Sequence, residues 1–178
     1  MTIPNMLTLL RLFLTPVIIA LLFVNIPYAK WAAVLLFVVA GLTDVFDGII
    51  AKKLDQKTHF GSFMDPMVDK IMINSLFITL LALQIVPLWT VLLMVAREFA
   101  VQVIRDAAKA GGKILRSEWS GKIKADLQGI TIFISLFSIA YGIGYMYAEI
   151  AMIITLAVSY YALFEFLFKN RTFLKKWM

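Results

Sequence analysis

Four aspartates lie in two stretches of the chain that are otherwise apolar enough to cross a membrane. Asp44 and Asp47 belong to the first stretch, and Asp65 and Asp69 belong to the second. A carboxylate inside a bilayer is costly and is tolerated where it has a partner. Four such groups in neighbouring stretches therefore indicate a site that binds a positively charged ligand.

The spacing of these residues gives each stretch one polar face. Positions i, i+3, i+4 and i+7 of the first helix hold Asp44, Asp47, Gly48 and Ala51. Steps of four along the second helix connect Gly61, Asp65 and Asp69. Residues 53–60 (KLDQKTHF) are polar enough to form a turn outside the bilayer. We therefore expect two antiparallel helices whose carboxylates meet in one pocket just below a membrane surface.

The predicted pocket offers oxygen donors only, because the chain has no cysteine and its single histidine, His59, falls in the turn. Such donors suit Mg²⁺ or Mn²⁺ better than zinc or copper. Four carboxylates can hold two ions, an arrangement typical of displacement at phosphorus. Gly48 and Gly61 would let a phosphate or sugar approach the backbone closely, and Lys52 can reach the same phosphates. The residues thus predict phosphoryl transfer, with one carboxylate available to accept a proton.

The composition places the chain among membrane proteins. Of its 178 residues, 62% are hydrophobic and 16% are charged, and the mean hydropathy is +0.89. Soluble domains are about 45 to 50% apolar. The net charge of +6 is expected to orient the protein and to contact anionic lipid headgroups. We expect no nucleic-acid partner.

Apolar periodicity predicts an all-α integral membrane protein, a bundle of six transmembrane helices in a single domain of residues 1–178. The predicted spans are residues 5–24, 31–53, 62–84, 87–108, 121–143 and 147–168. Thirteen of the 17 basic residues lie on the side of the two chain ends, whereas Lys30 alone lies among the opposite connections. Basic residues favour the cytoplasmic side, so we expect both termini and the carboxylate pocket there.

The aspartate pattern resembles the signature of the CDP-alcohol phosphatidyltransferases, D-x-x-D-G-x-x-A-R-x₈-G-x₃-D-x₃-D. Only Lys52 departs from it, since arginine is usual at that position. Lysine keeps the charge but loses the bidentate fork.

The resemblance implies transfer of a phosphatidyl group from CDP-diacylglycerol to an alcohol with release of CMP. It makes Asp44, Asp47 and Asp65 metal ligands, with Asp69 as the general base that also touches the second metal. It further implies a homodimer in a bacterial cytoplasmic (inner) membrane, in contact with membrane lipids.

Shorter segments resemble the phosphatidylglycerophosphate synthase branch of that family, whose acceptor is sn-glycerol 3-phosphate. They are Ile3–Arg11, Ala96–Phe99 and Gly121–Lys124. Four basic residues near the predicted pocket are expected to bind the acceptor phosphate: Arg97, Arg105, Lys122 and Lys124. The donor lipid is expected to contact Asn5, Thr8, Gly48, Lys52 and Gly61.

Several interpretations stay open at this level. Asn5, Thr8 and Arg11 repeat every three residues along one stripe, which either faces the nucleotide or forms helix-to-helix hydrogen bonds. Arg97 either points into the pocket or pairs with a carboxylate of another helix, since Glu98 is adjacent in sequence but falls on a different face. The acceptor alternatives are inositol phosphate, serine and phosphatidylglycerol. A divalent-cation transporter is a different class of function that would also place aspartates in a membrane.

Overall fold

The structure is a computed structural model that describes residues 3–53, 59–112, 115 and 119–171. Within these ranges the description covers the backbone, but not the side chains, of residues 3–4, 27, 44–53, 59–60 and 62–63. Several of the predicted site residues belong to the last set.

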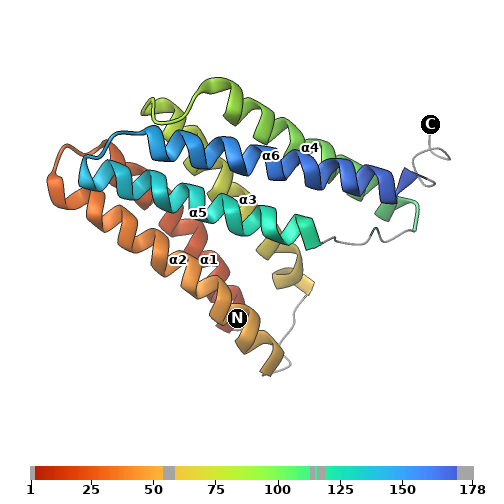
Figure 1. The fold of residues 1–178 in the computed structure, drawn as a ribbon. Helices are drawn as coiled ribbons and strands as arrows, with labels where there is room; N and C mark the ends of the chain where they lie inside the picture. The colour runs from red at the N-terminus through yellow and green to blue at the C-terminus, as the bar shows by residue number, and fades with distance from the viewer. Residues whose placement is uncertain (1–2, 54–58, 113–114, 116–118, 172–178) are drawn as a thin grey trace.

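The six predicted helices are confirmed in the described part of the chain, and Figure 1 shows their arrangement. Their bounds are α1 Ile3–Phe23, α2 Pro27–Lys53, α3 His59–Ala82, α4 Leu88–Ala110, α5 Trp119–Tyr141 and α6 Met146–Lys169. These bounds lie close to the predicted ones because long apolar runs set the helix cores. Helix α5 ends at Tyr141, and the next residue, Gly142, has a positive φ of 72° that lets the Ile143 N–H donate back to the Ser138 carbonyl at 3.1 Å.

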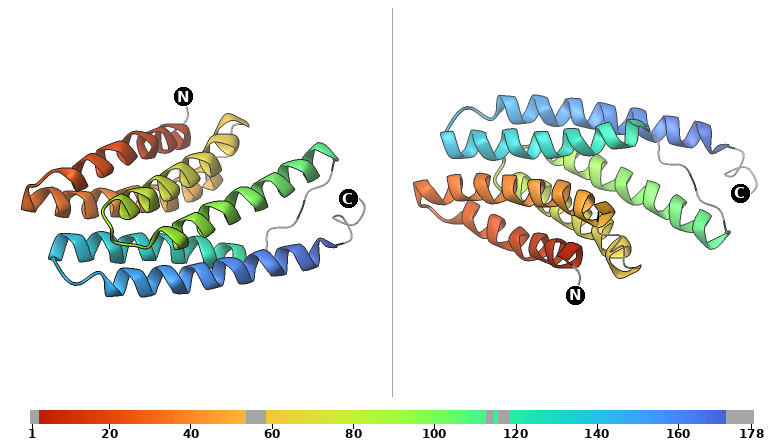
Figure 2. Two further views of the ribbon diagram at one scale, coloured as in Figure 1. Left: turned by 90° about the horizontal axis from the view of Figure 1, so that it is seen from above. Right: turned by 90° about the horizontal axis from the view of Figure 1, so that it is seen from below.

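Short connections make the helices within each connected pair run in opposite directions. The α1–α2, α3–α4 and α5–α6 connections all lie at one end of the bundle, and α1 begins at the other end (Figure 1). Figure 2 shows the helices close together at the connected end and diverging toward the end where α1 begins. Helix α1 packs against α2 and α3, whereas α6 packs against α4 and α5.

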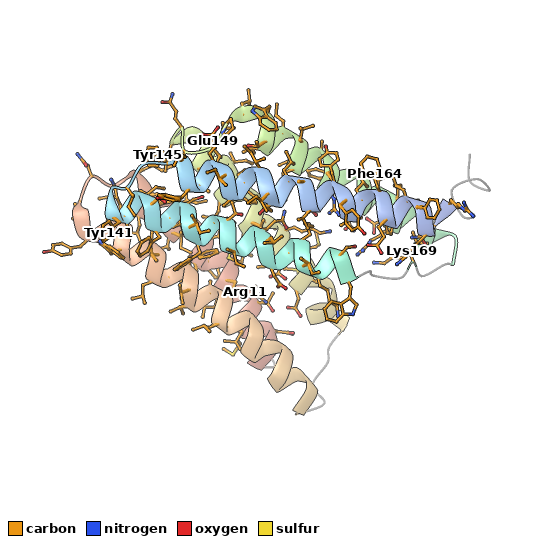
Figure 3. All side chains as sticks on the ribbon, viewed as in Figure 1. Arg11, Tyr141, Tyr145, Glu149, Phe164 and Lys169 are labelled. Atoms are coloured by element: carbon orange, nitrogen blue, oxygen red, sulfur yellow. The ribbon has the colours of Figure 1, made fainter. Side chains whose placement is uncertain are left out.

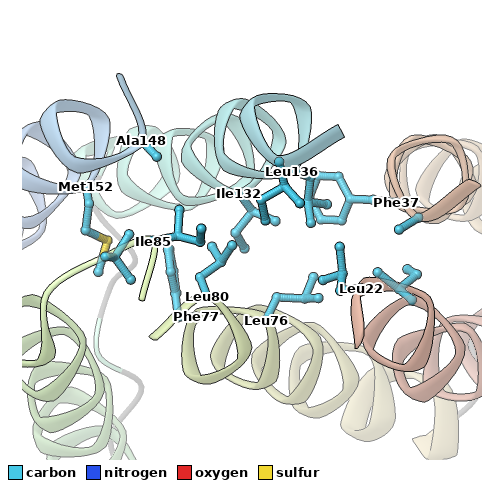
Figure 4. Packing of buried hydrophobic residues seen from close by; sticks show 14 of the residues in the cluster. Leu22, Phe37, Leu76, Phe77, Leu80, Ile85, Ile132, Leu136, Ala148 and Met152 are labelled. Carbon is cyan, nitrogen blue, oxygen red and sulfur yellow. The ribbon is translucent and has the colours of Figure 1, made fainter. Parts of the chain in front are cut away.

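The apolar core occupies the connected half of the bundle. The cluster includes Leu22 of α1, Leu76 and Phe77 of α3, Leu136 of α5 and Met152 of α6 (Figure 4). All five side chains are buried, four of them with no exposed surface. In a lipid bilayer, side chains packed in this way stabilise the bundle through van der Waals contact between the helices. The residues of the predicted site lie in the other half, where the helices diverge. The packed core therefore holds the helices that carry the site.

Three described helices are long and apolar enough to cross a membrane, by length and composition. They are residues Asn5–Phe23, Trp119–Tyr141 and Met146–Lys169. Their outward faces carry large apolar side chains such as Phe13, which is 69% exposed, and Phe164, which is 64% exposed. Exposed apolar surface on this scale is typical of contact with lipid, and the chain is an integral membrane protein on these grounds.

Candidate active site

Two of the four aspartates project from α3 toward α1. Asp65 accepts a hydrogen bond from Thr8 Oγ1, and Asp69 accepts one from Arg11 Nη1. Arg11 Nη2 also lies 4.0 Å from Asp65 Oδ1. Both carboxylates remain about two-fifths exposed, because the helices diverge at this end. The i, i+4 spacing on α3 thus presents two accessible oxygen-donor groups on one face, as the sequence predicted.

Arg11 continues the stripe of Asn5 and Thr8 along one face of α1, for which the sequence left contact with the nucleotide and helix-to-helix hydrogen bonding open. Its side chain is 1% exposed on the inner side of α1 (Figure 3) and forms ion pairs with the two α3 aspartates. A buried guanidinium requires such partners, and it fixes the orientation of the carboxylates that it contacts. The available signal was the three-residue step from Asn5 through Thr8 to Arg11, which lines up one face of α1.

The other two aspartates, Asp44 and Asp47, lie within the helical part of α2. Their side chains are outside the described residues, as are those of Gly48 and Lys52. The structure therefore gives the helix on which these four residues stand, but not how their side chains are directed.

The described residues fit a hard divalent ion by the chemistry of their donors. Asp65 and Asp69 supply carboxylate oxygens from one face of α3, and the nearest helix adds a hydroxyl from Thr8. Among the described side chains, no three acidic or histidine groups gather closely enough to hold an ion by themselves. A complete ligand set at this place would thus need Asp44 and Asp47.

The residues expected at the donor lipid are distributed around the same end. Asn5 is half-buried on α1 one turn before Thr8, and Gly61 is buried at the start of α3. Thr8 is itself 1% exposed. Thr8 contacts Asp65 directly, while Gly61 stands about one helical turn before Asp65 on α3.

A second polar region lies between α3, α4, α5 and α6. It is a cavity of about 140 Å³ with four basic residues in its lining: Lys70, Arg97, Arg105 and Lys124. Three of these four were predicted to bind an acceptor phosphate, and the structure brings those three together. Lys122 is exposed on α5 and is not among the residues that line this cavity.

Arg97 is held in place by two contacts. Its Nε donates to the Ser159 carbonyl of α6 at 3.1 Å, and its Nη1 lies 3.4 Å from Glu98 Oε1. The expectation that Glu98 cannot meet Arg97 is wrong, because both side chains are long enough to bend around the helix toward each other. Arg97 therefore lines the cavity and also pairs with a carboxylate of its own helix.

Arg105 is anchored differently from Arg97. Its guanidinium lies over the ring of Phe166, 5.4 Å from the centroid. Its Nε is buried without a hydrogen-bond partner among the described residues. A buried donor of this kind is costly unless a ligand or water satisfies it, which makes Arg105 the best placed of the cations to receive an anion.

Lys70 and Glu98 are cavity residues without a predicted role. Lys70 follows Asp69 directly on α3 and donates to Gln102 of α4, while Glu98 accepts from Lys124 of α5. Lys70 could have been found from the rule that a lysine inside a membrane needs a partner. Both residues also line a larger cavity of about 670 Å³ that contains Arg11 and Asp69. The cation-lined cavity therefore adjoins the α3 carboxylates.

Comparison with known proteins gives a consistent result. The sequence model of the CDP-alcohol phosphatidyltransferase family matches residues 1–161. The CDP-diacylglycerol–glycerol-3-phosphate 3-phosphatidyltransferase of Bacillus subtilis (strain 168) is 30% identical over 97% of this chain and 96% of that protein. An Escherichia coli (strain K12) protein of the same name is 33% identical over 73% of the chain and 74% of its own length. A probable phosphatidylglycerophosphate synthase of Mycobacterium tuberculosis is 38% identical over 72% of the chain and 62% of its own length.

Proposed function

Because the chain belongs to the CDP-alcohol phosphatidyltransferase family, we propose that it transfers the phosphatidyl group of CDP-diacylglycerol to sn-glycerol 3-phosphate. The products are phosphatidylglycerophosphate and CMP. An acceptor hydroxyl oxygen attacks the phosphorus on the lipid side of the diphosphate, and the bond from that phosphorus to the CMP oxygen breaks. The hydroxyl proton passes to a carboxylate, for which Asp69 is the candidate.

Asp69 is suited to accept this proton because Arg11 fixes its orientation from α1. A base acts efficiently when it lies within hydrogen-bond reach of the proton that it removes. Arg11 is a positioning residue in this account.

Mg²⁺ or Mn²⁺, as two ions, would be held by Asp44, Asp47, Asp65 and Asp69. Bound there, the ions neutralise the diphosphate and the charge that develops on the departing CMP. The support for this assignment is the oxygen-only donor set and the accessible pair of carboxylates on α3. Asn5, Thr8, Gly48, Lys52 and Gly61 would contact the donor lipid near its phosphates.

The observation that carries the choice of acceptor is the cavity with four basic residues beside Asp69. A phosphate brings up to two negative charges and is well matched by guanidinium and ammonium donors. Serine and other acceptors without a phosphate would leave the buried Arg105 Nε unsatisfied. We assign Lys70, Arg97, Arg105 and Lys124 to the acceptor phosphate, while the role of Lys122 rests on the sequence alone.

The membrane arrangement follows from the same reasoning. All six helices span the bilayer, both termini lie in the cytoplasm, and the active site faces the cytoplasm in a bacterial inner membrane. The excess of basic residues on the side of the termini supports this orientation. The lipid tails then remain in the bilayer while the acceptor enters from water. The protein acts as a homodimer in this proposal, by analogy with its family.

The test is a product assay with purified protein, CDP-diacylglycerol and Mg²⁺ or Mn²⁺. Candidate acceptors are added one at a time: sn-glycerol 3-phosphate, glycerol, inositol phosphate, serine and phosphatidylglycerol. We expect CMP release and a new lipid of the phosphatidylglycerophosphate mass with glycerol 3-phosphate. Equal turnover of glycerol or inositol phosphate would refute the acceptor assignment, and no CMP release with any alcohol would refute the enzyme itself.

A further inference from the structure

Glu98 is a carboxylate in a cavity that is otherwise built for an anion. Its side chain is 11% exposed on α4, and it lines the cavity together with Arg97, Arg105 and Lys124. A carboxylate there repels a phosphate that binds nearby. If the cavity had only to hold phosphate, Glu98 would weaken it. Its presence therefore calls for a second role.

The contacts of Glu98 involve one of its two oxygens. Lys124 Nζ donates to Oε1, Arg97 Nη1 lies 3.4 Å from it, and Gln128 Nε2 lies 3.5 Å from it. Within the part of the chain that the structure describes, no donor reaches Oε2. An ionised carboxylate oxygen is acceptor-only. The group that completes Oε2 must therefore be a hydrogen-bond donor, such as a hydroxyl.

The position of Glu98 indicates which hydroxyl of the acceptor it can contact. Glu98 lines the cation cavity that contains Arg105, and it also lines the adjoining cavity that contains Asp69. Three residues line both cavities: Lys70, Glu98 and Lys124. An acceptor whose phosphate binds at Arg105 and whose attacking hydroxyl reaches Asp69 runs past these three residues, and Glu98 is the one among them that can accept a hydrogen bond from a hydroxyl. Repulsion from the Glu98 carboxylate keeps the phosphate at the Arg105 end of the cavity. There the buried Arg105 Nε has no hydrogen-bond partner among the described residues.

We propose that Glu98 Oε2 accepts a hydrogen bond from the C2 hydroxyl of glycerol 3-phosphate and so selects acceptors that carry a hydroxyl at the middle carbon. Glu98 is then a specificity-determining residue, while Lys124 and Arg97 hold its other oxygen and fix its direction. This inference rests on the proposed function. It adds that the site recognises the glycerol backbone as well as the phosphate.

The experiment compares two acceptors on the same enzyme preparation: sn-glycerol 3-phosphate and 3-hydroxypropyl phosphate, which lacks the C2 hydroxyl. The quantity measured is the ratio of their kcat/KM values from CMP release. Because both values come from one preparation, partial unfolding of a variant cancels from the ratio. We expect the unmodified enzyme to prefer glycerol 3-phosphate by about 10- to 100-fold, the effect of one hydrogen bond to a charged group.

The variants are Glu98→Ala and Glu98→Gln, with Glu165→Gln as the matched control. Glu165 is also a partly buried carboxylate bonded to a lysine, Lys169, but it lies outside both cavities. We expect the ratio to fall to about threefold or less for Glu98→Ala, to an intermediate value for Glu98→Gln, and to be unchanged for Glu165→Gln.

Three results would overturn the inference. They are a Glu98→Ala ratio equal to that of the unmodified enzyme, an unmodified enzyme that does not distinguish the two acceptors, and loss of turnover with both acceptors in both Glu98 variants. The last result would assign Glu98 to holding Lys124 and Arg97 in place. Failure of the unmodified enzyme to use glycerol 3-phosphate at all is a different outcome, since it refutes the proposed function.

Discussion

Replacement of Arg105 by glutamine tests whether the cation cavity binds the acceptor phosphate. Arg105 is the cavity cation whose loss least disturbs the protein itself, because its Nε has no partner among the described residues and its guanidinium lies over the Phe166 ring. A hydrogen bond to a charged group is worth about 1.5 to 3 kcal/mol. At about 1.4 kcal/mol per factor of ten, the KM for glycerol 3-phosphate should rise roughly 10- to 100-fold. The KM for CDP-diacylglycerol should change little.

A substitution of Phe166 tests the same assignment and should have a smaller effect on the acceptor KM. A cation over an aromatic face at this distance gains about 0.5 to 1 kcal/mol, so Phe166→Leu should raise the acceptor KM by roughly two- to fivefold. Arg171→Gln is the matched control, since Arg171 lies over the Phe168 ring at 4.9 Å and is not among the cavity residues. The assay is CMP release with each substrate varied in turn. Equal increases in both KM values would assign Arg105 to the donor, and no increase would place the acceptor elsewhere.

Further predictions concern the carboxylate end of the site. Asp65→Asn should raise the Mn²⁺ concentration needed for half-maximal CMP release, whereas Asp69→Asn should chiefly lower kcat; normal turnover in both would refute the site. A chelator should abolish activity and added Mg²⁺ or Mn²⁺ should restore it, so full activity in its presence would exclude the metal-dependent mechanism. Lys52→Arg should retain CMP release, whereas Lys52→Ala should lower the rate of CMP release by about 10- to 100-fold. An unchanged rate in the alanine variant would show that Lys52 is only an interfacial charge. Arg11→Lys should lower kcat and Arg11→Met should lower it further, measured beside thermal unfolding, and a loss of stability without a loss of kcat would make Arg11 purely structural.

The sequence allowed the helices and half of the carboxylate site to be predicted. Long apolar runs specify helices directly, so the six predicted ranges agree with the observed ones to within a few residues. The four-residue step from Asp65 to Asp69 likewise placed both side chains on one face of α3, and the structure shows both directed toward α1. Periodicity is sufficient for the face of α3 on which these residues stand, but not for the partner helix α1, whose contacting residues lie 57 and 58 positions earlier in the chain.

The contacts between distant helices could not be predicted in this way. Periodicity gives the face on which a residue stands, but not which helix lies opposite that face. Glu98 meets Lys124, 26 positions further along the chain, and Lys70 meets Gln102, 32 positions further. Both contacts depend on the packing of α4 and α5 beside α3. The pairing of Arg97 with Glu98 also depends on side-chain length, which a helical wheel leaves out.

The charges of the cation cavity show how folding and binding can use the same residue. Four basic side chains face one carboxylate, Glu98, so the cavity keeps an excess of positive charge for a phosphate. Buried cations without any anion would repel one another and destabilise the bundle. A second carboxylate would remove much of the attraction for the acceptor. Glu98 answers both needs when Oε1 holds Lys124 and Arg97 and Oε2 is directed to the substrate. The carboxylate that makes the cations tolerable in the folded protein is then also the group that recognises the glycerol hydroxyl.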